Sequence, residues 1–477
     1  MNVVQKIREE TTGCRNKRAI VDGDRNISYG DLFIAVDKVA TLLQEHGIKD
    51  AERVGLLYSD SIEYVIINLA VLSIKAVIVP IFSSLAEDEI NVLTERMEIN
   101  FIISEKESEY QDMTSQGLYD CTLEKGFFLY SRTAQKDISE TFRALNPAFI
   151  RFSSGTTGVN KGVILSHESI IQRTDAANKG LNITSRDEII WVLSMTFHFV
   201  VTIFLFLRQG ATIIICSRAF PGTLLDGLKQ NKATFMYASP FHYYMLTHTD
   251  MFSSDLLSGI RMAVSTASKL PNENAAAFYE KFGFELSQAY GIIEIGLPFI
   301  NRSQDKSKRS SVGELLPDYE LRLLNADSEG VGEVWIRGKG MLEAYFSPWK
   351  TRNDLLEDNW FNTGDLGRLD KDGFLFLTGR TKNIINFCGM KIFPYEVELV
   401  INQHLAVKES LVYGVPHSRY GQLPCAKVVL REKEGADFSS RDIKKFCYTH
   451  LAPHKVPKEF HFVSCLDKTP SGKLKRK

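Results

Sequence analysis

The sequence predicts an α/β fold: a large N-terminal domain of parallel-type sheets flanked by helices, then a β-rich subdomain, then a small α+β domain at the C-terminus. Up to residue 300, short apolar runs alternate with stretches of helical periodicity, which is typical of parallel sheets with helices on both faces. From Gly313 to Leu377, turns and strands become denser. After Gly379, about 95 further residues carry their own strands and helices, which is the usual size of a domain.

The first elements are a hairpin and a helix. Residues 18–21 and 26–28 are predicted strands that flank an Asp-Gly turn. Ser28 begins a capping box with Asp31. The apolar residues that follow recur at helical spacing and predict an amphipathic helix: Leu32, Val36, Val39, Leu42 and Leu43.

Further short apolar runs predict strands at residues 54–58, 76–79, 148–152, 162–165, 213–216, 234–238 and 262–265. Two longer apolar stretches are predicted to be core rather than membrane spans. Residues 64–82 are interrupted by Asn68, Lys75 and Pro80, and residues 196–207 fall short of the ~20 residues that a spanning helix needs.

The predicted domain boundary follows the segment Gly379-Arg380-Thr381, so that the two domains span residues 1–381 and 382–477. The second domain contains predicted helices at 394–402 and 440–451 and predicted strands at 411–415, 426–430 and 459–463.

The most informative segment is FSSGTTGVNKGVILSH, residues 152–167, which lies between two predicted strands. Its glycines allow a backbone to approach a ligand closely, and its hydroxyls, backbone N–H groups and Lys161 can hold phosphate oxygens. It is not a Walker loop, because Asn160 stands where the second glycine would fall and Gly162 follows the lysine. On composition alone, a polar surface loop and a phosphate-binding loop both remain open.

The bulk composition narrows the class. The formal net charge is -1, and no clustered basic face indicates nucleic-acid binding. Seven cysteines occur without a C-x-x-C pair, which favours reduced thiols. The first residues lack the apolar core of a signal peptide. We therefore expect a cytoplasmic protein with no membrane span and no nucleic-acid partner.

Several motifs follow the glycine-rich loop in a fixed order: YGIIE, WFNTGDLG, GRTKNII, GMKIFPYEVE and TPSGKLKRK, within residues 290–477. Together with SSGTTGVNKG they resemble the adenylate-forming (ANL) superfamily of acyl- and aryl-CoA synthetases, stand-alone adenylation enzymes and luciferases. The motifs cover residues 153–477, and the N-terminal third carries none.

The resemblance implies an ATP site. The loop that would hold the β- and γ-phosphates matches Ser153, Ser154, Gly155, Thr156, Thr157, Gly158 and Lys161. Glu294 matches a Mg²⁺ ligand and Tyr290 an aromatic residue that stacks on adenine. Asp365 matches a carboxylate that binds the ribose hydroxyls, and Arg380 a second ribose or phosphate contact, although a simple salt bridge is the alternative for Arg380.

The resemblance also implies a mobile C-terminal lid. Lys473 matches a lysine that enters the active site when the lid closes and bridges the carboxylate and the α-phosphate. Taken alone, it would be a solvated lysine in a basic tail. Lys382 matches the hinge, and Gly389 matches a position in the tunnel that admits the thiol arm.

An acyl pocket is implied by the same resemblance. Its predicted lining is mostly apolar, with His198 as an aromatic gate: His198, Phe199, Val200, Thr266, Ala289 and Leu297, with Phe197 and Ile295 nearby. An apolar lining favours a hydrophobic acid over an α-amino acid. Ala289 stands where glycine is common and would narrow the pocket toward flat aromatic or short acyl acids. Ile293 replaces the usual threonine and removes a hydroxyl near the α-phosphate.

The predicted function is ATP-dependent activation of an aryl or short- to medium-chain carboxylic acid to an acyl-adenylate, followed by transfer to the thiol of CoA. ATP, Mg²⁺ and CoA are the implied cofactors, and a small carboxylic acid is the implied partner. One alternative is transfer to the phosphopantetheine of an acyl or aryl carrier protein. The other is a catalytically weak relative that binds nucleotide or acyl groups.

Overall fold

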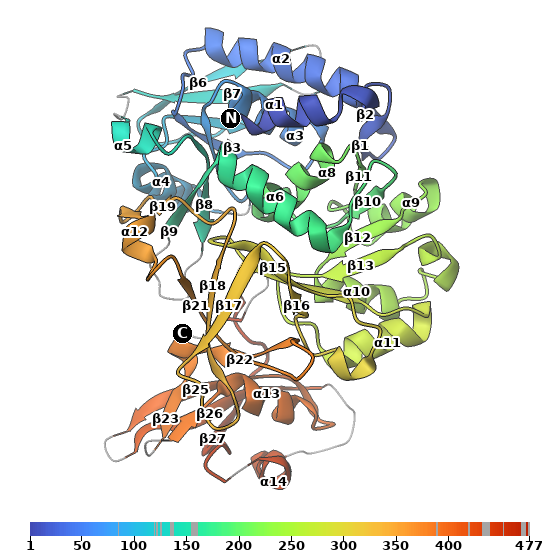
Figure 1. The fold of residues 1–477 in the computed structure, drawn as a ribbon, viewed down its shortest axis with the longest axis vertical. Coiled ribbons are helices and arrows are strands. Elements are labelled where there is room, and N and C mark those ends of the chain that lie inside the picture. The colour runs from blue at the N-terminus through green and yellow to red at the C-terminus, as the bar shows by residue number, and fades with distance from the viewer. Residues whose placement is uncertain are drawn as a thin grey trace. The chain divides into compact units, whose positions relative to one another are not determined.

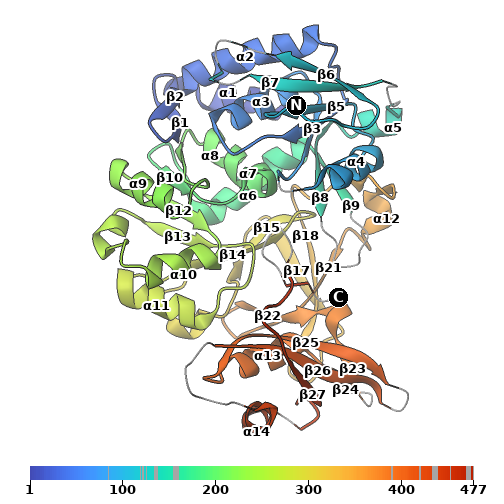
Figure 2. The same ribbon diagram turned by 180° about the vertical axis from the view of Figure 1, so that it is seen from behind.

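The computed structural model describes residues 1–477 apart from 84, 119, 121–122, 125, 134–137, 154–160, 388–389, 418–419, 432–438, 452, 469–473 and 476–477. The chain forms two compact units (Figures 1 and 2). The first comprises residues 1–320 and 337–361, and the second comprises residues 321–336 and 362–477.

One nine-stranded sheet of the first unit has a parallel centre. Its strands run in the order β16 (Glu314–Leu315), β15 (Gly296–Asn301), β14 (Ser287–Ile292), β13 (Met262–Ser265), β12 (Phe235–Ala238), β10 (Glu188–Trp191), β11 (Thr212–Ile215), β1 (Arg18–Asp22) and β2 (Arg25–Ser28). Strands β14, β13, β12, β10, β11 and β1 are parallel, and β15, β16 and β2 add antiparallel edges. The predicted hairpin β1–β2 and the predicted strands β11, β12 and β13 are confirmed.

The second nine-stranded sheet contains the hairpin around the glycine-rich loop. Its strands run in the order β20 (Lys350–Thr351), β19 (Ala344–Tyr345), β9 (Lys161–Ser166), β8 (Pro147–Ser153), β4 (Val77–Pro80), β3 (Arg53–Leu57), β5 (Phe101–Ser104), β7 (Phe127–Arg132) and β6 (Met113–Leu118). Strands β8 and β9 pair antiparallel on either side of residues 154–160, so the predicted order of strand, loop and strand is confirmed.

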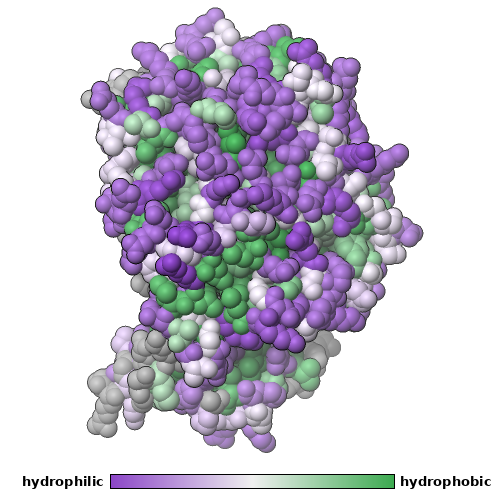
Figure 3. Space-filling view, in the orientation of Figure 1, coloured by the Kyte–Doolittle hydropathy of each residue, from purple (hydrophilic) through white to green (hydrophobic). Residues whose placement is uncertain are grey.

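Helices cover and separate the two sheets: α1 (Val3–Glu10), α2 (Tyr29–Glu45), α3 (Ile62–Ser73), α4 (Glu87–Arg96), α5 (Glu140–Arg143), α6 (His167–Leu181), α7 (Met195–His198), α8 (Phe204–Arg208), α9 (Gly222–Gln230), α10 (Pro240–His248), α11 (Asn272–Phe282) and α12 (Arg352–Leu355). Helix α6 contacts β9 of one sheet and β15 of the other and lies between them in both ribbon views (Figures 1 and 2). The face of the first unit that carries α1, α2 and α6 is mostly hydrophilic (Figure 3).

The helix cap and the buried apolar stretches that the sequence predicts are present in these helices. The Ser28 hydroxyl accepts the Asp31 N–H at 3.1 Å, which confirms the predicted cap of α2. Helix α3 is buried over almost its whole length, and residues 196–207 form α7, the π-helical turn η2 (Phe199–Ile203) and most of α8. Both long apolar stretches are therefore core, as predicted. In the described part of the chain, no helix is long and apolar enough to cross a membrane.

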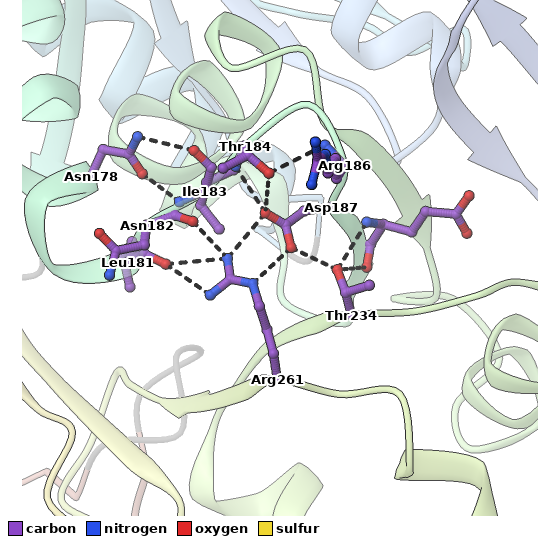
Figure 4. A network of polar contacts seen from close by, with 10 residues as sticks. Asn178, Leu181, Asn182, Ile183, Thr184, Arg186, Asp187, Thr234 and Arg261 are labelled. Carbon is purple, nitrogen blue, oxygen red and sulfur yellow. Dashed lines mark hydrogen bonds and ion pairs between the residues drawn. The ribbon is translucent and has the colours of Figure 1, made fainter.

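A polar cluster fixes the amino ends of the central strands (Figure 4). Arg261 donates to the two carboxylate oxygens of Asp187 at 2.8 and 3.0 Å, and Thr234 donates to the same carboxylate at 2.7 Å. Arg261 also reaches the carbonyls of Leu181 and Asn182 at the end of α6. Burial alone would raise the pKa of Asp187, but these hydrogen bonds lower it below its ordinary value. The cluster ties β10, β12 and β13 together at the edge opposite their carboxyl ends.

The second unit contains two antiparallel-rich sheets. One has the order β17 (Tyr319–Leu324), β18 (Gly332–Gly338), β21 (Phe361–Leu369) and β22 (Leu375–Arg380). The other has the order β24 (Met390–Ile392), β23 (Ile385–Phe387), β26 (Gly421–Leu430) and β25 (Val407–His417), with β27 (Glu459–Phe462) paired to β26, and packs with α13 (Pro394–Asn402) and α14 (Ser440–His450). The predicted strands and helices of this region are confirmed.

The division into domains of residues 1–381 and 382–477 stays a prediction, and the two compact units have other bounds. Helix α13 contacts β22, and residues 321–336 and 362–377 of the β-rich segment belong to the same compact unit as the C-terminal strands. Residue 382 lies two positions after the end of β22, within a single 3-10 turn (Thr381–Asn383). The hinge at Lys382 stays a prediction.

Candidate active site

The glycine-rich loop joins β8 to β9. Ser154, Gly155, Thr156, Thr157 and Gly158 lie outside the described residues, whereas Ser153 ends β8 opposite Lys161 in the pairing register. A Cβ at Gly162 would lie 2.7 Å from the Met97 sulfur and 2.8 Å from an Ile150 methyl. The glycine after Lys161 is therefore required by packing beneath the loop.

Lys161 lies beside a tyrosine and a glutamate. Its Nζ atom is 4.5 Å from the centre of the Tyr345 ring, and the Tyr345 hydroxyl donates to the Glu294 carboxylate at 3.0 Å. Burial raises the pKa of Tyr345, and the Glu294 carboxylate raises it further, so the hydroxyl stays protonated and remains a donor. Pairing of β19 with β9, Tyr345 opposite Val163, brings the ring to the loop. The sequence analysis missed Tyr345, since no periodicity marks a two-residue strand.

The turn that carries Glu294 is held by hydrogen bonds to its backbone carbonyls. Arg173 is completely buried in α6 and donates to the Ile293 carbonyl at 3.1 Å and, through two nitrogens, to the Gly340 carbonyl at 3.0 and 2.6 Å. The Leu342 N–H donates to the Glu294 carbonyl at 2.7 Å. Burial lowers the pKa of Arg173 to about 10, so it remains charged at neutral pH. Arg173 was also missed, and its place in an amphipathic helix gave no signal of this role.

Tyr290 and Ala289 lie on β14, next to a bulge. The β14–β15 register pairs Ala289 with Ile300 and Tyr290 with Phe299, and then shifts before Ile292. A Cβ at Gly291 would lie 2.1 Å from the Gly296 carbonyl oxygen, so only glycine fits there. The partly exposed Tyr290 ring has its centre 6.1 Å from that of Phe299.

An aromatic wall stands on β10 and β12. Trp191 and Tyr237 are neighbours in the parallel register, and their rings are 6.0 Å apart at 10°. The His198 ring lies 6.2 Å from Trp191, and the Tyr237 hydroxyl is 3.4 Å from Thr266 Oγ1. Burial raises the pKa of Tyr237 to about 12. The structure thus places His198 and Thr266 against one wall, whose aromatic residues the sequence analysis did not select.

The other predicted pocket residues are buried. Phe199 is 1% exposed, and its ring packs in the core against Tyr64, Phe149 and Phe204 at 5.8, 6.1 and 4.9 Å. Val200 lies in η2 and Leu297 in β15, both almost fully buried. A lining role for these three residues stays a prediction.

Asp365 and Arg380 form an ion pair within the second unit. They face each other in the β21–β22 register, and Arg380 Nε donates to Asp365 Oδ1 at 2.7 Å. Asp365 is almost buried, and its N–H donates to the Thr363 hydroxyl at 3.1 Å. The pair is compatible with both the ribose role and the salt-bridge alternative. Gly389 and Lys473 lie outside the described residues, as does the Lys382 side chain.

Comparison with known families decides the class. The AMP-binding enzyme family matches residues 7–346, and the AMP-binding enzyme C-terminal domain matches residues 396–473. The chain belongs to the AMP-binding enzyme family. It is an adenylate-forming ligase that uses ATP and CoA, which confirms the predicted superfamily, fold class and enzyme class.

Similar proteins include several CoA ligases. The medium-chain acyl-CoA ligase ACSF2 of Bos taurus mitochondria is 26% identical, covering 97% of this chain and 84% of the relative. Oxalate–CoA ligase of Arabidopsis thaliana is 28% identical over 97% of this chain and 95% of its own length. 4-Coumarate–CoA ligase 3 of Oryza sativa is 31% identical over 68% of this chain and 62% of its own length.

Solved structures of AMP-binding enzymes share the fold. ATP-bound MatB from Rhodopseudomonas palustris aligns with a TM-score of 0.84 at 22% identity, over 100% of this chain and 97% of that one. The o-succinylbenzoate CoA synthetase of Bacillus subtilis, in complex with its acyl-adenylate, aligns with a TM-score of 0.83 at 22% identity, with the same coverage.

Proposed function

We propose that this enzyme adenylates a flat aromatic or short- to medium-chain carboxylic acid and then transfers the acyl group to CoA. The observation that carries the proposal is the group formed by Lys161, Tyr345 and Glu294 beside the glycine-rich loop. A cation and an oriented carboxylate at a loop rich in N–H and hydroxyl donors suit a bound nucleoside triphosphate. The aromatic wall of Trp191 and Tyr237 suits an apolar acid.

In this proposal, different residues bind the phosphates, the adenine and the ribose of the nucleotide. The loop residues 153–158 and Lys161 hold the β- and γ-phosphates, and Tyr290 stacks on adenine. Asp365 accepts hydrogen bonds from the ribose hydroxyls, while Arg380 orients that carboxylate through the 2.7 Å bond.

Glu294 fits a magnesium ion. Mg²⁺ prefers one or two carboxylate ligands and completes its shell with phosphate oxygens and water. Glu294 supplies one carboxylate, and the Tyr345 hydroxyl on Oε1 orients it. In the described residues, no group of three or more His, Cys, Asp or Glu side chains could hold a metal ion by itself. When bound, Mg²⁺ would screen the charge of the phosphates that face Glu294.

The C-terminal domain completes the two half-reactions. Lys473 stabilises the charge that develops between the acid and the α-phosphate during adenylation. Lys382 is the hinge about which the domain turns, and Gly389 leaves room for the pantetheine arm at the second step. A group that is delivered by domain motion is withdrawn when the next step needs the same space.

Two finer points belong to this proposal. A carrier-protein phosphopantetheine is the alternative acceptor, because it presents the same thiol arm as CoA. We place the enzyme in the cytoplasm because the described cysteines 14, 216, 425, 447 and 465 are all free thiols. ACSF2 is mitochondrial, so the mitochondrion is the alternative location for this enzyme. Imaging of a tagged chain would test it.

ATP–pyrophosphate exchange tests the proposal. The acids would be benzoate, 4-hydroxycinnamate, butyrate and octanoate, with wild type and Lys473→Ala assayed together. We expect exchange with at least one of them and a loss of more than about 100-fold in the variant, because a charge-stabilising donor is removed. The active acid would then be offered free CoA and a holo carrier protein in parallel. ATP binding without exchange for any acid would instead support the weak relative.

A further inference from the structure

Arg151 is an arginine next to the active site that the proposed function leaves without a role. It lies on β8, three residues before the undescribed loop, and pairs with Val163 of β9. The side chain is half-buried, and a half-buried guanidinium needs partners that replace water.

The guanidinium has two contacts with one residue of the neighbouring segment. Its Nη1 donates to the Phe197 carbonyl, and its Cζ atom lies 5.1 Å from the centre of the Phe197 ring. The Phe197 ring also packs against Phe82 at 4.9 Å. Phe197 is therefore held through both its backbone and its ring, directly before His198.

A second charged residue holds the same segment at its start. The Asp60 carboxylate accepts the Met195 N–H at 3.0 Å. The segment of residues 195–203 comprises α7, with four residues, and the π-helical turn η2. These residues begin a helical run that continues through α8 to Arg208. The first N–H groups of a helix have no partner within it, so the Asp60 carboxylate and Arg151 anchor the end of the run that carries His198.

The charge on Arg151 persists at neutral pH. Burial lowers the pKa of Arg151 to about 10, and Tyr64 and the Glu294 carboxylate oppose that shift. The guanidinium thus contacts the segment that carries His198 and interacts electrostatically with the Glu294 carboxylate.

We propose that Arg151 is a positioning residue: it holds Phe197 so that His198 stays against the Trp191 wall, and it thereby sets the affinity of the acyl pocket for its acid. The inference takes the identity of the acyl pocket from the proposed function. The anchoring of residues 195–203 by Arg151 does not depend on that function. Arg151 acts through Phe197 and contributes little to nucleotide binding.

Two measurements test this on the full-length enzyme: hydrogen–deuterium exchange of the peptides that cover residues 195–203, and separate KM values for acid and ATP in pyrophosphate exchange. Arg151→Met keeps the length of the side chain but removes its charge and donors. We expect amide exchange in residues 195–203 to accelerate by roughly 10-fold, since one charge-assisted anchor is lost. The KM of the acid should rise by about 10-fold, while the KM of ATP stays within twofold.

Two further variants separate positioning from general damage. Arg151→Lys retains the charge near Glu294 but not the planar fork, so it should show most of the effect on the acid. Arg261→Met removes a comparable arginine, whose Cζ is 5.4 Å from the Phe235 ring, directly before β13 in the other nine-stranded sheet. It should leave exchange in residues 195–203 and the KM of the acid unchanged.

Unchanged amide exchange in Arg151→Met would overturn the inference, as would a rise in the KM of ATP equal to that of the acid. If wild type shows no pyrophosphate exchange with any acid, the proposed function fails. The deuterium measurement would still decide whether Arg151 anchors the segment.

Discussion

At the scale of single residues, the turn Ile293–Glu294 is held by groups from two distant segments, helix α6 and residues 342–345. Tyr345 orients the carboxylate, Arg173 binds the Ile293 carbonyl, and the Leu342 N–H binds the Glu294 carbonyl. The backbone of residue 293 is thus fastened, whereas its side chain offers no hydroxyl. We therefore expect Ile293 to affect the rate of adenylation only through the hydrogen bond that a threonine hydroxyl would donate.

Ile293→Thr should therefore raise the rate of adenylation. A threonine adds one hydroxyl near the position assigned to the α-phosphate, and one new hydrogen bond in the transition state is worth roughly 3- to 10-fold in rate. Pyrophosphate exchange at saturating ATP and acid would measure it. Ile293→Val is the control, because it has the shape of threonine without the oxygen. Equal rates for the two variants would contradict the prediction.

At the scale of elements, the pairing of β14 with β15 requires that residue 291 has no side chain. The carbonyl oxygen of Gly296, which has φ +113°, fills the site where a Cβ of residue 291 would stand. The bulge turns the chain between Tyr290 and Glu294, so packing there controls two site residues at once.

Gly291→Ala should disrupt this bulge. We expect the variant to lose about 2–3 kcal/mol in the free energy of unfolding, because the new methyl overlaps a carbonyl that has no room to move. Urea denaturation would measure the loss, and pyrophosphate exchange should fall with it. At Gly222, where no atom lies within 4 Å of an added Cβ, Gly222→Ala should be close to neutral. A neutral Gly291→Ala would show that the turn can rearrange.

A histidine docks the N-terminal helix. The Val3 N–H donates to His167 Nδ1 at 3.2 Å, and both residues are buried. Burial lowers the pKa of His167 to about 4, although Glu168 opposes the shift. The folded state therefore holds this histidine neutral, and protonation would remove the acceptor that α1 uses.

The stability of the fold should fall on acidification because of His167. Its pKa is near 6.5 when unfolded and about 4 when folded. The unfolded state thus gains protons first as pH drops below 6.5, and stability is lost between pH 6.5 and 4. At pH 5 this loss is about 2 kcal/mol relative to pH 7. His167→Asn retains an acceptor but does not titrate, so urea denaturation at both pH values should show a correspondingly smaller drop. An equal drop would exclude His167 as the source.

At the scale of the whole molecule, the residues that the proposed function assigns to nucleotide binding are distributed over two compact units. Lys161, Tyr290 and Glu294 lie in the first unit, and Asp365 and Arg380 lie in the second. Residue 382 lies in the 3-10 turn that follows β22, where a change of a few backbone angles would reorient all that comes after it. A hinge at this position would separate the two half-reactions in time.

Lys382→Pro should slow thioester formation far more than adenylation. Proline fixes φ near −65°, so we expect adenylation to stay within about threefold of wild type while thioester formation falls by roughly 100-fold or more. Pyrophosphate exchange reports the first step, and CoA thioester formation reports the second. Lys382→Ala, which leaves the backbone free, should affect neither strongly. Parallel losses in both steps would argue against a hinge at this residue.

The chemistry of this enzyme was accessible from the sequence because its motifs are short and contiguous. The glycine-rich loop, YGIIE and NTGDLG each hold their information within a few residues, and their order indicated the superfamily. Caps and hairpins such as those at Ser28 and around Gly23 are equally local, since they depend on hydrogen bonds between near neighbours.

What the sequence could not show is which distant residues meet. Tyr345 reaches Glu294 and Arg151 reaches Phe197 only because the fold brings separate segments together. Trp191 stands beside Tyr237 because β10 pairs with β12. Periodicity reveals the buried face of a strand but not its neighbour or register. The grouping of residues 321–336 and 362–377 with the C-terminal strands was decided in the same way. It follows from contacts between elements, and these exist only once the chain has folded.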